Sequence, residues 1–146
     1  MFRVMIDTEI LIDAAPGRVW EVLTDFASYP DWNPMIRRAS GDLTPGARLN
    51  LHFEPEGQKG KDFRPKLMTA DPGRELRWLG NPGFKGLLES QHYFILEGQP
   101  GGKTRLLHGM DVYGLLGAVV GKKLESSTTG PFTDMNRALK ARAESA

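Results

Sequence analysis

The sequence contains no cysteine, which excludes disulfide scaffolds, thiolate nucleophiles, iron–sulfur clusters and cysteine-based zinc sites. It also lacks an apolar run of the roughly eighteen residues that a membrane span requires. Asp7, Glu9 and Asp13 interrupt the apolar stretch at the N-terminus, which is therefore unlike a secretory signal. We expect a cytoplasmic protein that is stabilised by packing and makes no stable membrane insertion.

An excess of charge of one sign is missing as well. Nineteen Lys and Arg against eighteen Asp and Glu leave a formal charge of +1, too little to neutralise a phosphate backbone. The glycine-rich residues 80–83 and 98–102 lack the spacing and the lysine of a phosphate-binding loop, and no Gly-x-Ser-x-Gly occurs. We therefore expect no nucleic-acid partner and no hydrolase or kinase activity.

The length and composition that remain are those of an ordinary globular protein. The chain has 146 residues, of which 40% are hydrophobic and 25% charged. A chain of this size buries about two thirds of its unfolded surface, which leaves room for a small cavity inside the core. We expect residues 1–146 to form a single domain.

The first thirty residues predict one strand and two short helices. Residues 4–12 alternate charged and apolar side chains, which indicates a strand with one dry face. Pro16 can occupy a first helical position, and apolar residues at helical spacing follow it, so we expect a helix over 16–26. Two prolines within residues 28–34 allow at most one further helical turn.

Residues 35–113 consist of short apolar runs separated by turn signals, such as Pro100-Gly101-Gly102 and Asn81-Pro82-Gly83. This spacing is typical of an antiparallel meander. We expect strands over 36–41, 47–54, 62–70, 74–80, 87–97 and 103–113. With the first strand they make seven, which can form one strongly curved sheet.

Residues 115–145 predict a long C-terminal helix. Apolar residues recur there at steps of three and four: Leu116, Val120, Leu124, Phe132, Met135 and Leu139. A continuous helix would be about 45 Å long, longer than we expect a compact domain of this size to be. We therefore predict a break or kink at Gly130-Pro131.

Several sequence segments resemble a known superfamily. The first is the opening Pro16, Val19-Trp20, Leu23, Asp25-Phe26, Tyr29-Pro30, Trp32-Asn33-Pro34 and Ile36; the later ones are residues 75–78, 92–94, 102–105 and 135–140. They are similar to the START-related, Bet v 1-like (SRPBCC) superfamily, in its polyketide cyclase/dehydrase-like or ligand-transport branch. The resemblance implies an α+β helix-grip fold, in which a curved seven-stranded sheet wraps around the C-terminal helix and encloses an apolar cavity. Members of the superfamily differ widely in activity, so the fold does not name a function.

Strand alternation predicts which side chains face that cavity. Phe53, Phe63, Leu67, Leu76 and Trp78 share the apolar faces of their strands. The opposite parity places His52 and Met68 outside.

The last hairpin adds polar groups to the inward face. His92, Phe94, His108 and Met110 share the face that carries no charge. A turn centred on Pro100 would place His92 directly opposite His108. The pair could anchor a ligand carbonyl or hydroxyl, or act as a general acid or base; alternatively, each ring only bonds its neighbours. We expect burial to keep at least one ring neutral.

These inferences give a set of candidate ligand-binding residues and three functional hypotheses. Two inward histidines fall short of three zinc ligands, and we expect neither a metal nor another cofactor. The first hypothesis is binding or transport of a small hydrophobic ligand, such as a lipid, a quinone or a polyketide-like aromatic, by a monomer or weak homodimer. The second is a cyclase or dehydratase that uses a pocket histidine, His92 or His108; the third is a protein-interaction module with a vestigial cavity. The candidate residues are Phe53, Phe63, Leu67, Leu76, Trp78, His92, Phe94, His108, Met110, Met135 and Leu139.

Overall fold

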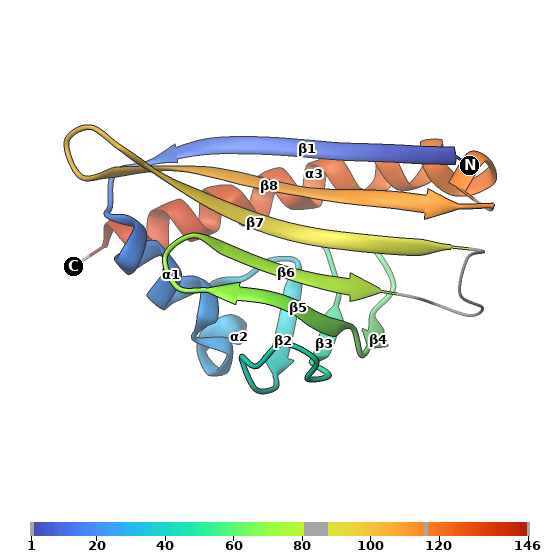
Figure 1. Cartoon of the computed structure of the whole chain (residues 1–146), viewed down its shortest axis with the longest axis horizontal. Coiled ribbons are helices and arrows are strands. Elements are labelled where there is room, and N and C mark those ends of the chain that lie inside the picture. The colour runs from blue at the N-terminus through green and yellow to red at the C-terminus, as the bar shows by residue number, and fades with distance from the viewer. Residues whose placement is uncertain (1, 81–87, 116, 146) are drawn as a thin grey trace.

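In the fold, a long C-terminal helix packs against a wall of curved antiparallel strands (Figure 1). The structure, a computed structural model, describes residues 2–80, 88–115 and 117–145. One sheet has the strand order β1-β8-β7-β6-β5, and a smaller one has the order β2-β3-β4. The elements are β1 (Phe2–Ile12), α1 (Pro16–Thr24), the 3₁₀ turn η1 (Phe26–Ser28), α2 (Tyr29–Trp32), β2 (Ile36–Ser40), β3 (Asn50–Phe53), β4 (Lys61–Phe63), β5 (Lys66–Asp71), β6 (Glu75–Gly80), β7 (Glu89–Gln99), β8 (Lys103–Gly114) and α3 (Gly117–Glu144).

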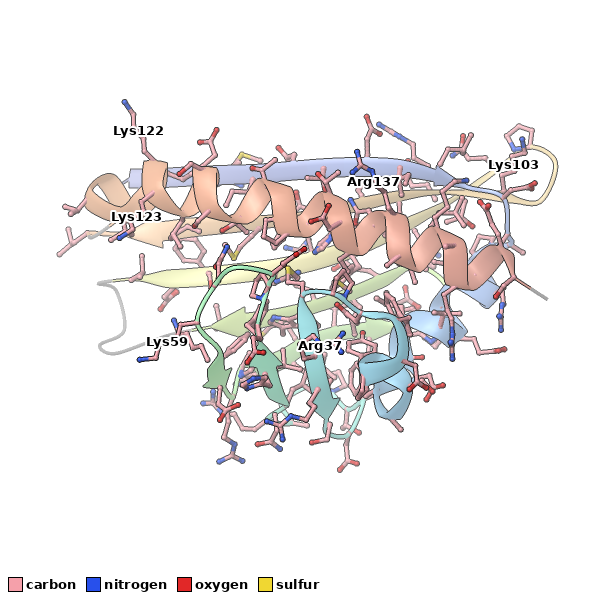
Figure 2. The ribbon with its side chains drawn as sticks, turned by 180° about the vertical axis from the view of Figure 1, so that it is seen from behind. Arg37, Lys59, Lys103, Lys122, Lys123 and Arg137 are labelled. Atoms are coloured by element: carbon pink, nitrogen blue, oxygen red, sulfur yellow. The ribbon has the colours of Figure 1, made fainter. Side chains whose placement is uncertain are left out.

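This α+β architecture is the helix-grip arrangement, with α3 packed along β1 and β8. Strand β1 and the two short helices that follow it, α1 and α2, lie where the sequence predicts them. Figure 2 shows the other side of the molecule, where the segments of the smaller sheet rise toward α3. The predicted turn at residues 81–83, the first residue of the strand predicted over 87–97, and Leu116 lie outside the described residues.

The prediction of one seven-stranded sheet is wrong, because residues 62–70 form two strands. Proline has no N–H to donate to a ladder, and Pro65 lies between β4 and β5. The two sheets nevertheless adjoin there: Leu49 N donates to the Pro65 carbonyl at 2.9 Å, and Leu67 N donates to the Ala47 carbonyl at 2.8 Å. The two adjoining sheets therefore form the predicted curved wall, with eight strands instead of seven.

The predicted break in the C-terminal helix is also wrong, since α3 runs through Pro131 without interruption. Pro131 cannot donate to the carbonyl of Ser127 four residues earlier. Gln58, in the β3–β4 loop, supplies the missing donor: its Nε2 lies 3.0 Å from that carbonyl oxygen. The long helix also fits the domain, because β8, with 12 residues, spans about 40 Å at roughly 3.3 Å per residue.

The turn between β7 and β8 shifts the predicted pairing by two residues. Gln99 pairs with Lys103, so the turn is centred on Gly101 instead of Pro100. Gly101 and Gly102 have φ of 82° and 73°, which glycine adopts without strain. Phe94 therefore lies opposite His108, and an even shift leaves every side chain on its predicted face.

The core is solid at the end of the sheet that carries α1 and the β7–β8 turn. Val19 and Leu23 from α1, Leu106 from β8 and Leu139 from α3 are all 0% exposed there. We call this region, defined by these four residues, the closed end. Within the described ranges, none of the helices combines the length and apolarity needed to cross a membrane.

Candidate ligand-binding pocket

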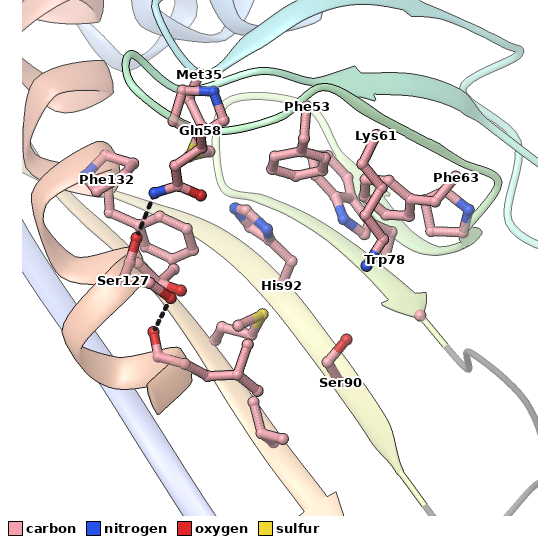
Figure 3. A pocket seen from close by; sticks show the side chains of 18 of the residues that line it. Met35, Phe53, Gln58, Lys61, Phe63, Trp78, Ser90, His92, Ser127 and Phe132 are labelled. Atoms are coloured by element: carbon pink, nitrogen blue, oxygen red, sulfur yellow. Dashed lines mark hydrogen bonds between the residues drawn. The ribbon is translucent and has the colours of Figure 1, made fainter. Parts of the chain in front are cut away.

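Away from the closed end, the sheet and α3 enclose a pocket of about 430 Å³ (Figure 3). Its floor is the inward face of β6, β7 and β8, and its sides are the β3–β4 segment and the middle of α3. We call this half of the molecule the pocket end. The apolar side chains that line it include Met35, Phe53, Phe63, Trp78, Met110, Val112, Leu124 and Phe132.

Aromatic rings form much of the pocket wall. Phe53 and Phe63 stack on each other with ring centroids 4.6 Å apart. Trp78 lies 4.7 Å from the imidazole of His92, and Phe132 of α3 lies 4.8 Å from the same imidazole. Such faces are suited to a flat, apolar molecule.

The rim of the pocket carries positive charge. Arg48, Lys59, Lys61 and Arg64 are exposed lining residues, and no Asp or Glu lines the pocket among the described residues. In the part of the chain that the structure describes, no ion pair joins any of the four to a carboxylate. Figure 2 shows Lys59 on the same end of the molecule as Lys122 and Lys123 of α3.

A chain of hydrogen bonds runs from the pocket wall into the core. His92 Nε2 lies 2.7 Å from His108 Nε2, and His108 Nδ1 lies 2.7 Å from Asn136 Oδ1 on α3. Asn136 Nδ2 donates to Thr8 Oγ1 at 2.8 Å, and Thr8 Oγ1 donates to the His108 carbonyl at 2.6 Å. The two imidazoles meet diagonally across β7 and β8.

Both imidazoles are neutral at physiological pH. Burial, with a smaller contribution from neighbouring His108, holds the pKa of His92 well below its ordinary value. Burial lowers the pKa of His108 to about 3, although hydrogen bonds to Asn136 and to the Phe132 backbone act in the opposite direction. The pair therefore offers neutral donors and acceptors, and no positive charge, to the inside of the protein.

Sequence comparison identifies the family to which this architecture belongs. Residues 3–144 match the family model described as polyketide cyclase/dehydrase and lipid transport. The chain belongs to this family. No curated protein matches the chain.

Solved structures share the fold of this family member at low sequence identity. The Zhui aromatase/cyclase of Streptomyces sp. R1128 is 18% identical with a TM-score of 0.73, covering 98% of this chain and 94% of its own. A START superfamily protein from Mycobacterium smegmatis is 21% identical with a TM-score of 0.75, covering 96% and 97%. Truncated norcoclaurine synthase from Thalictrum flavum is 15% identical with a TM-score of 0.75, covering 99% and 96%. At these identities the similarity shows the fold alone.

The pocket of this family member contains five of the eleven candidate residues predicted from the sequence. Phe53, Phe63, Trp78, His92 and Met110 line it. The other six are buried in the core and do not line the pocket: Leu67, Leu76, Phe94, His108, Met135 and Leu139. The predicted direct pairing of His92 with His108 is wrong by the two-residue shift, but the rings still meet.

Sequence reasoning missed several lining residues. Phe132 continues the apolar spacing of the C-terminal helix and could have been chosen with Met135 and Leu139. Gln58 and Lys59 lie in an irregular loop, where side-chain alternation gives no prediction. Ser90 contributes a hydroxyl on the same face of β7 as His92.

The third histidine lies outside the pocket, on the outer face as predicted. His52 Nδ1 lies 2.6 Å from Asp62 Oδ1, and its Nε2 lies 3.1 Å from Glu54 Oε1. The hydrogen bond to Asp62, then that to Glu54, raises the pKa of His52 above its ordinary value. Among the residues that the structure describes, no group of three or more His, Asp or Glu is placed to hold a metal ion.

A second hollow of about 560 Å³ lies against η1, α2 and the smaller sheet. Polar and charged side chains supply much of its wall, including Arg38, His52, Asp62 and Arg64. It has fewer aromatic walls than the first pocket, which is therefore the better site for an apolar molecule.

Proposed function

We propose that this protein binds or transports a small, mainly apolar molecule in the pocket between the sheet and α3. The observation that carries the proposal is the pocket of about 430 Å³, walled by stacked aromatic rings and by the neutral imidazole of His92. A ligand that loses roughly 200 Å² of apolar surface there gains about 5 kcal/mol. Lipids, quinones and polyketide-like aromatics are ligands of this kind. We further propose that residues 1–146 act as one cytoplasmic ligand-binding domain, as a monomer or weak homodimer.

The rim supports a ligand that carries a negative charge at one end. Lys61 and Arg64 of the β4 segment and Lys59 of the loop surround an apolar interior without a lining carboxylate. A carboxylate, phosphate or phenolate at the mouth would be attracted to these groups, while its apolar body lies against Phe53 and Trp78. The ligand class that fits both parts of the pocket is an amphipathic acid.

One observation favours a second candidate function, a reaction of the cyclase or dehydratase type. His92 is neutral, lines the pocket and has a single hydrogen-bonding partner among the described residues, His108. A neutral imidazole against the bound molecule can accept a proton from it. By contrast, a pocket of this volume gives little support to an interaction module with a vestigial cavity.

Native mass spectrometry of the protein as purified tests the proposal. We expect an additional mass from an apolar molecule that is lost on denaturation. Met110→Trp fills the pocket and abolishes that mass, whereas Met68→Trp, on the exposed outer face, leaves it unchanged. Equal retention by both variants would contradict the proposed site.

His92→Ala separates the two candidate functions. If the protein is a carrier, the variant keeps ligand uptake within about tenfold of the native protein, because most of the binding free energy comes from apolar burial. If it is an enzyme, turnover of the bound molecule stops while uptake remains. Mass spectrometry of the released molecule before and after incubation distinguishes the two results.

A further inference from the structure

Each hydrogen bond in the chain behind the pocket has one possible direction of donation, and Thr8, at the end of the chain, fixes it. The hydroxyl of Thr8 lies 2.6 Å from the His108 carbonyl oxygen, and a carbonyl can only accept. The single hydrogen of Thr8 is therefore donated there. Thr8 Oγ1 must then accept from Asn136 Nδ2, 2.8 Å away.

The orientation of Asn136 fixes the hydrogen on His108. With Nδ2 directed at Thr8, Asn136 presents Oδ1 to His108 Nδ1 at 2.7 Å. An amide oxygen only accepts, so His108 Nδ1 carries a hydrogen. Because the buried His108 is neutral, its Nε2 carries none and is a hydrogen-bond acceptor.

The same logic fixes His92 at the pocket wall. His92 Nε2 lies 2.7 Å from His108 Nε2, and one of the two nitrogens must donate. Since His108 Nε2 accepts, His92 Nε2 carries the hydrogen, and the neutral ring has none on Nδ1. No hydrogen bond reaches that Nδ1 from the residues that the structure describes, and Figure 3 shows the His92 ring directed into the pocket.

We infer that His92 Nδ1 is a fixed hydrogen-bond acceptor in the pocket wall, and that the bound molecule presents an O–H or N–H donor to it. This inference rests on the proposed ligand binding and narrows it: a hydroxyl, phenol or enol is selected over a carbonyl or an ether at that point. Thr8, Asn136 and His108 are positioning residues, because they hold the His92 tautomer without touching the ligand. In the cyclase alternative, the same lone pair is the one that takes the proton.

Nitrogen-15 NMR of the full chain with labelled histidine reads the tautomers without any ligand. We expect His92 to be protonated on Nε2 and unprotonated on Nδ1, and His108 to show the reverse. A hydrogen on His92 Nδ1, or averaging between the two tautomers, would overturn the inference. In Asn136→Leu the side-chain acceptor for His108 is lost and only the hydrogen bond to the Phe132 backbone remains, so we expect a weaker preference for one tautomer at both rings; Thr8→Val, a milder change, tests the same step should the first variant fold poorly.

A matched pair of probes tests the consequence for binding. We expect 2-naphthol to bind at least about tenfold more tightly than 2-methoxynaphthalene, in which a methyl group replaces the hydroxyl hydrogen. In His92→Phe the ratio falls to about one, since the acceptor is gone and the ring shape is kept. Equal affinities in the native protein would overturn the inference and leave the proposed function standing. Binding of neither probe would overturn the proposed function, and the inference with it.

Discussion

The closed end and the pocket end of the molecule are built on the same strands and the same helix, yet one is solid and the other hollow. At the closed end, α1 packs against α3 and fills the space under the sheet with Val19 and Leu23. At the pocket end, the β3–β4 loop takes the place of a helix, and it contributes polar side chains such as Gln58 and Lys59 to the rim. What covers the sheet therefore decides whether an inward face becomes core or cavity.

Because of this difference, we expect the two ends to contribute to different properties of the protein. Truncating a side chain that is wholly surrounded by protein destabilises the fold in two ways: the free energy of burying the removed atoms is lost, and so are their packing contacts. Side chains that border a hollow lose less, because part of their surface already faces empty space or solvent. We expect stability to depend on the closed end and ligand affinity on the pocket end.

The largest effect is expected from truncation at the closed end. Leu139 is 0% exposed, so Leu139→Ala should lower the free energy of unfolding by about 3 kcal/mol. Ligand affinity should stay within about threefold, because Leu139 does not line the pocket. Urea denaturation and a binding titration measure the two quantities. A loss of stability below about 1 kcal/mol would remove the distinction between the ends.

The histidine pair, which lies between the two ends, should make stability depend on pH. In the unfolded chain both rings bind protons near the ordinary pKa of about 6.5, whereas the folded pair stays neutral because burial lowers both pKa values. The unfolded state then binds more protons than the folded state. The contribution of the pair to the free energy of unfolding is therefore complete above the ordinary pKa and is lost as the pH falls. From about pH 7.5 to about pH 5.5 we expect a loss of about 1.4 kcal/mol for each histidine.

Urea denaturation across this pH range, with His52→Gln as the control, measures the effect. The raised pKa of His52 gives a contribution of the opposite sign, present below its ordinary pKa and lost as the pH rises through the raised value. The control should therefore retain the fall in stability. A flat profile in His52→Gln, where the opposing contribution is absent, would show that the buried pair takes up protons without unfolding.

The reverse pattern is expected from truncation at the pocket end. Phe53→Ala removes the ring stacked on Phe63 and should weaken ligand binding by at least about tenfold, or roughly 1.4 kcal/mol. Its cost to the free energy of unfolding should be only about 1 kcal/mol, since Phe53 is partly exposed. Isothermal titration measures the affinity, and urea denaturation beside Leu139→Ala measures the stability; equal losses of stability in the two variants would contradict the comparison.

The smallest effect concerns the contact between the loop and α3. Gln58→Ala removes the donor to the Ser127 carbonyl and should cost about 0.5 kcal/mol, with faster amide exchange over residues 55–60. Pro131→Ala should weaken the same loop contact, because the new backbone N–H can donate to the Ser127 carbonyl within the helix and compete with Gln58. Hydrogen exchange measured by mass spectrometry checks both variants. Unchanged exchange in both would show that the loop is held by other contacts.

Much of the fold could be predicted from the sequence because its faces are strongly patterned. The apolar parity of Leu49, Leu51 and Phe53 and the exposed parity of Met68 both match the observed burial. What could not be predicted depends on contacts distant in sequence. Pro65 ends β4 but also accepts a bond from Leu49, and Pro131 is tolerated because Gln58, far away in the chain, supplies the missing donor.

The sequence predicts which face of each strand points toward the site, but it does not predict where along the strands the site lies. Alternation places Leu76 and Trp78 on the same side, yet only Trp78 borders the pocket. The distinction arises from which element lies above each residue, and no local pattern carries that information. The meeting of His92 and His108 was predictable in spite of the shifted turn, because an even shift keeps both rings on one face.

Methionine methyl groups provide the most direct test of the hollow pocket end. Met35 and Met110 line the pocket, whereas Met135 is buried in the core and Met68 is exposed on the outer face. In a titration of methyl-labelled protein with 2-naphthol, we predict saturable shifts of the Met35 and Met110 resonances and none at Met135 or Met68. Shifts at Met68 alone, or no saturable shift at Met35 and Met110, would contradict the account.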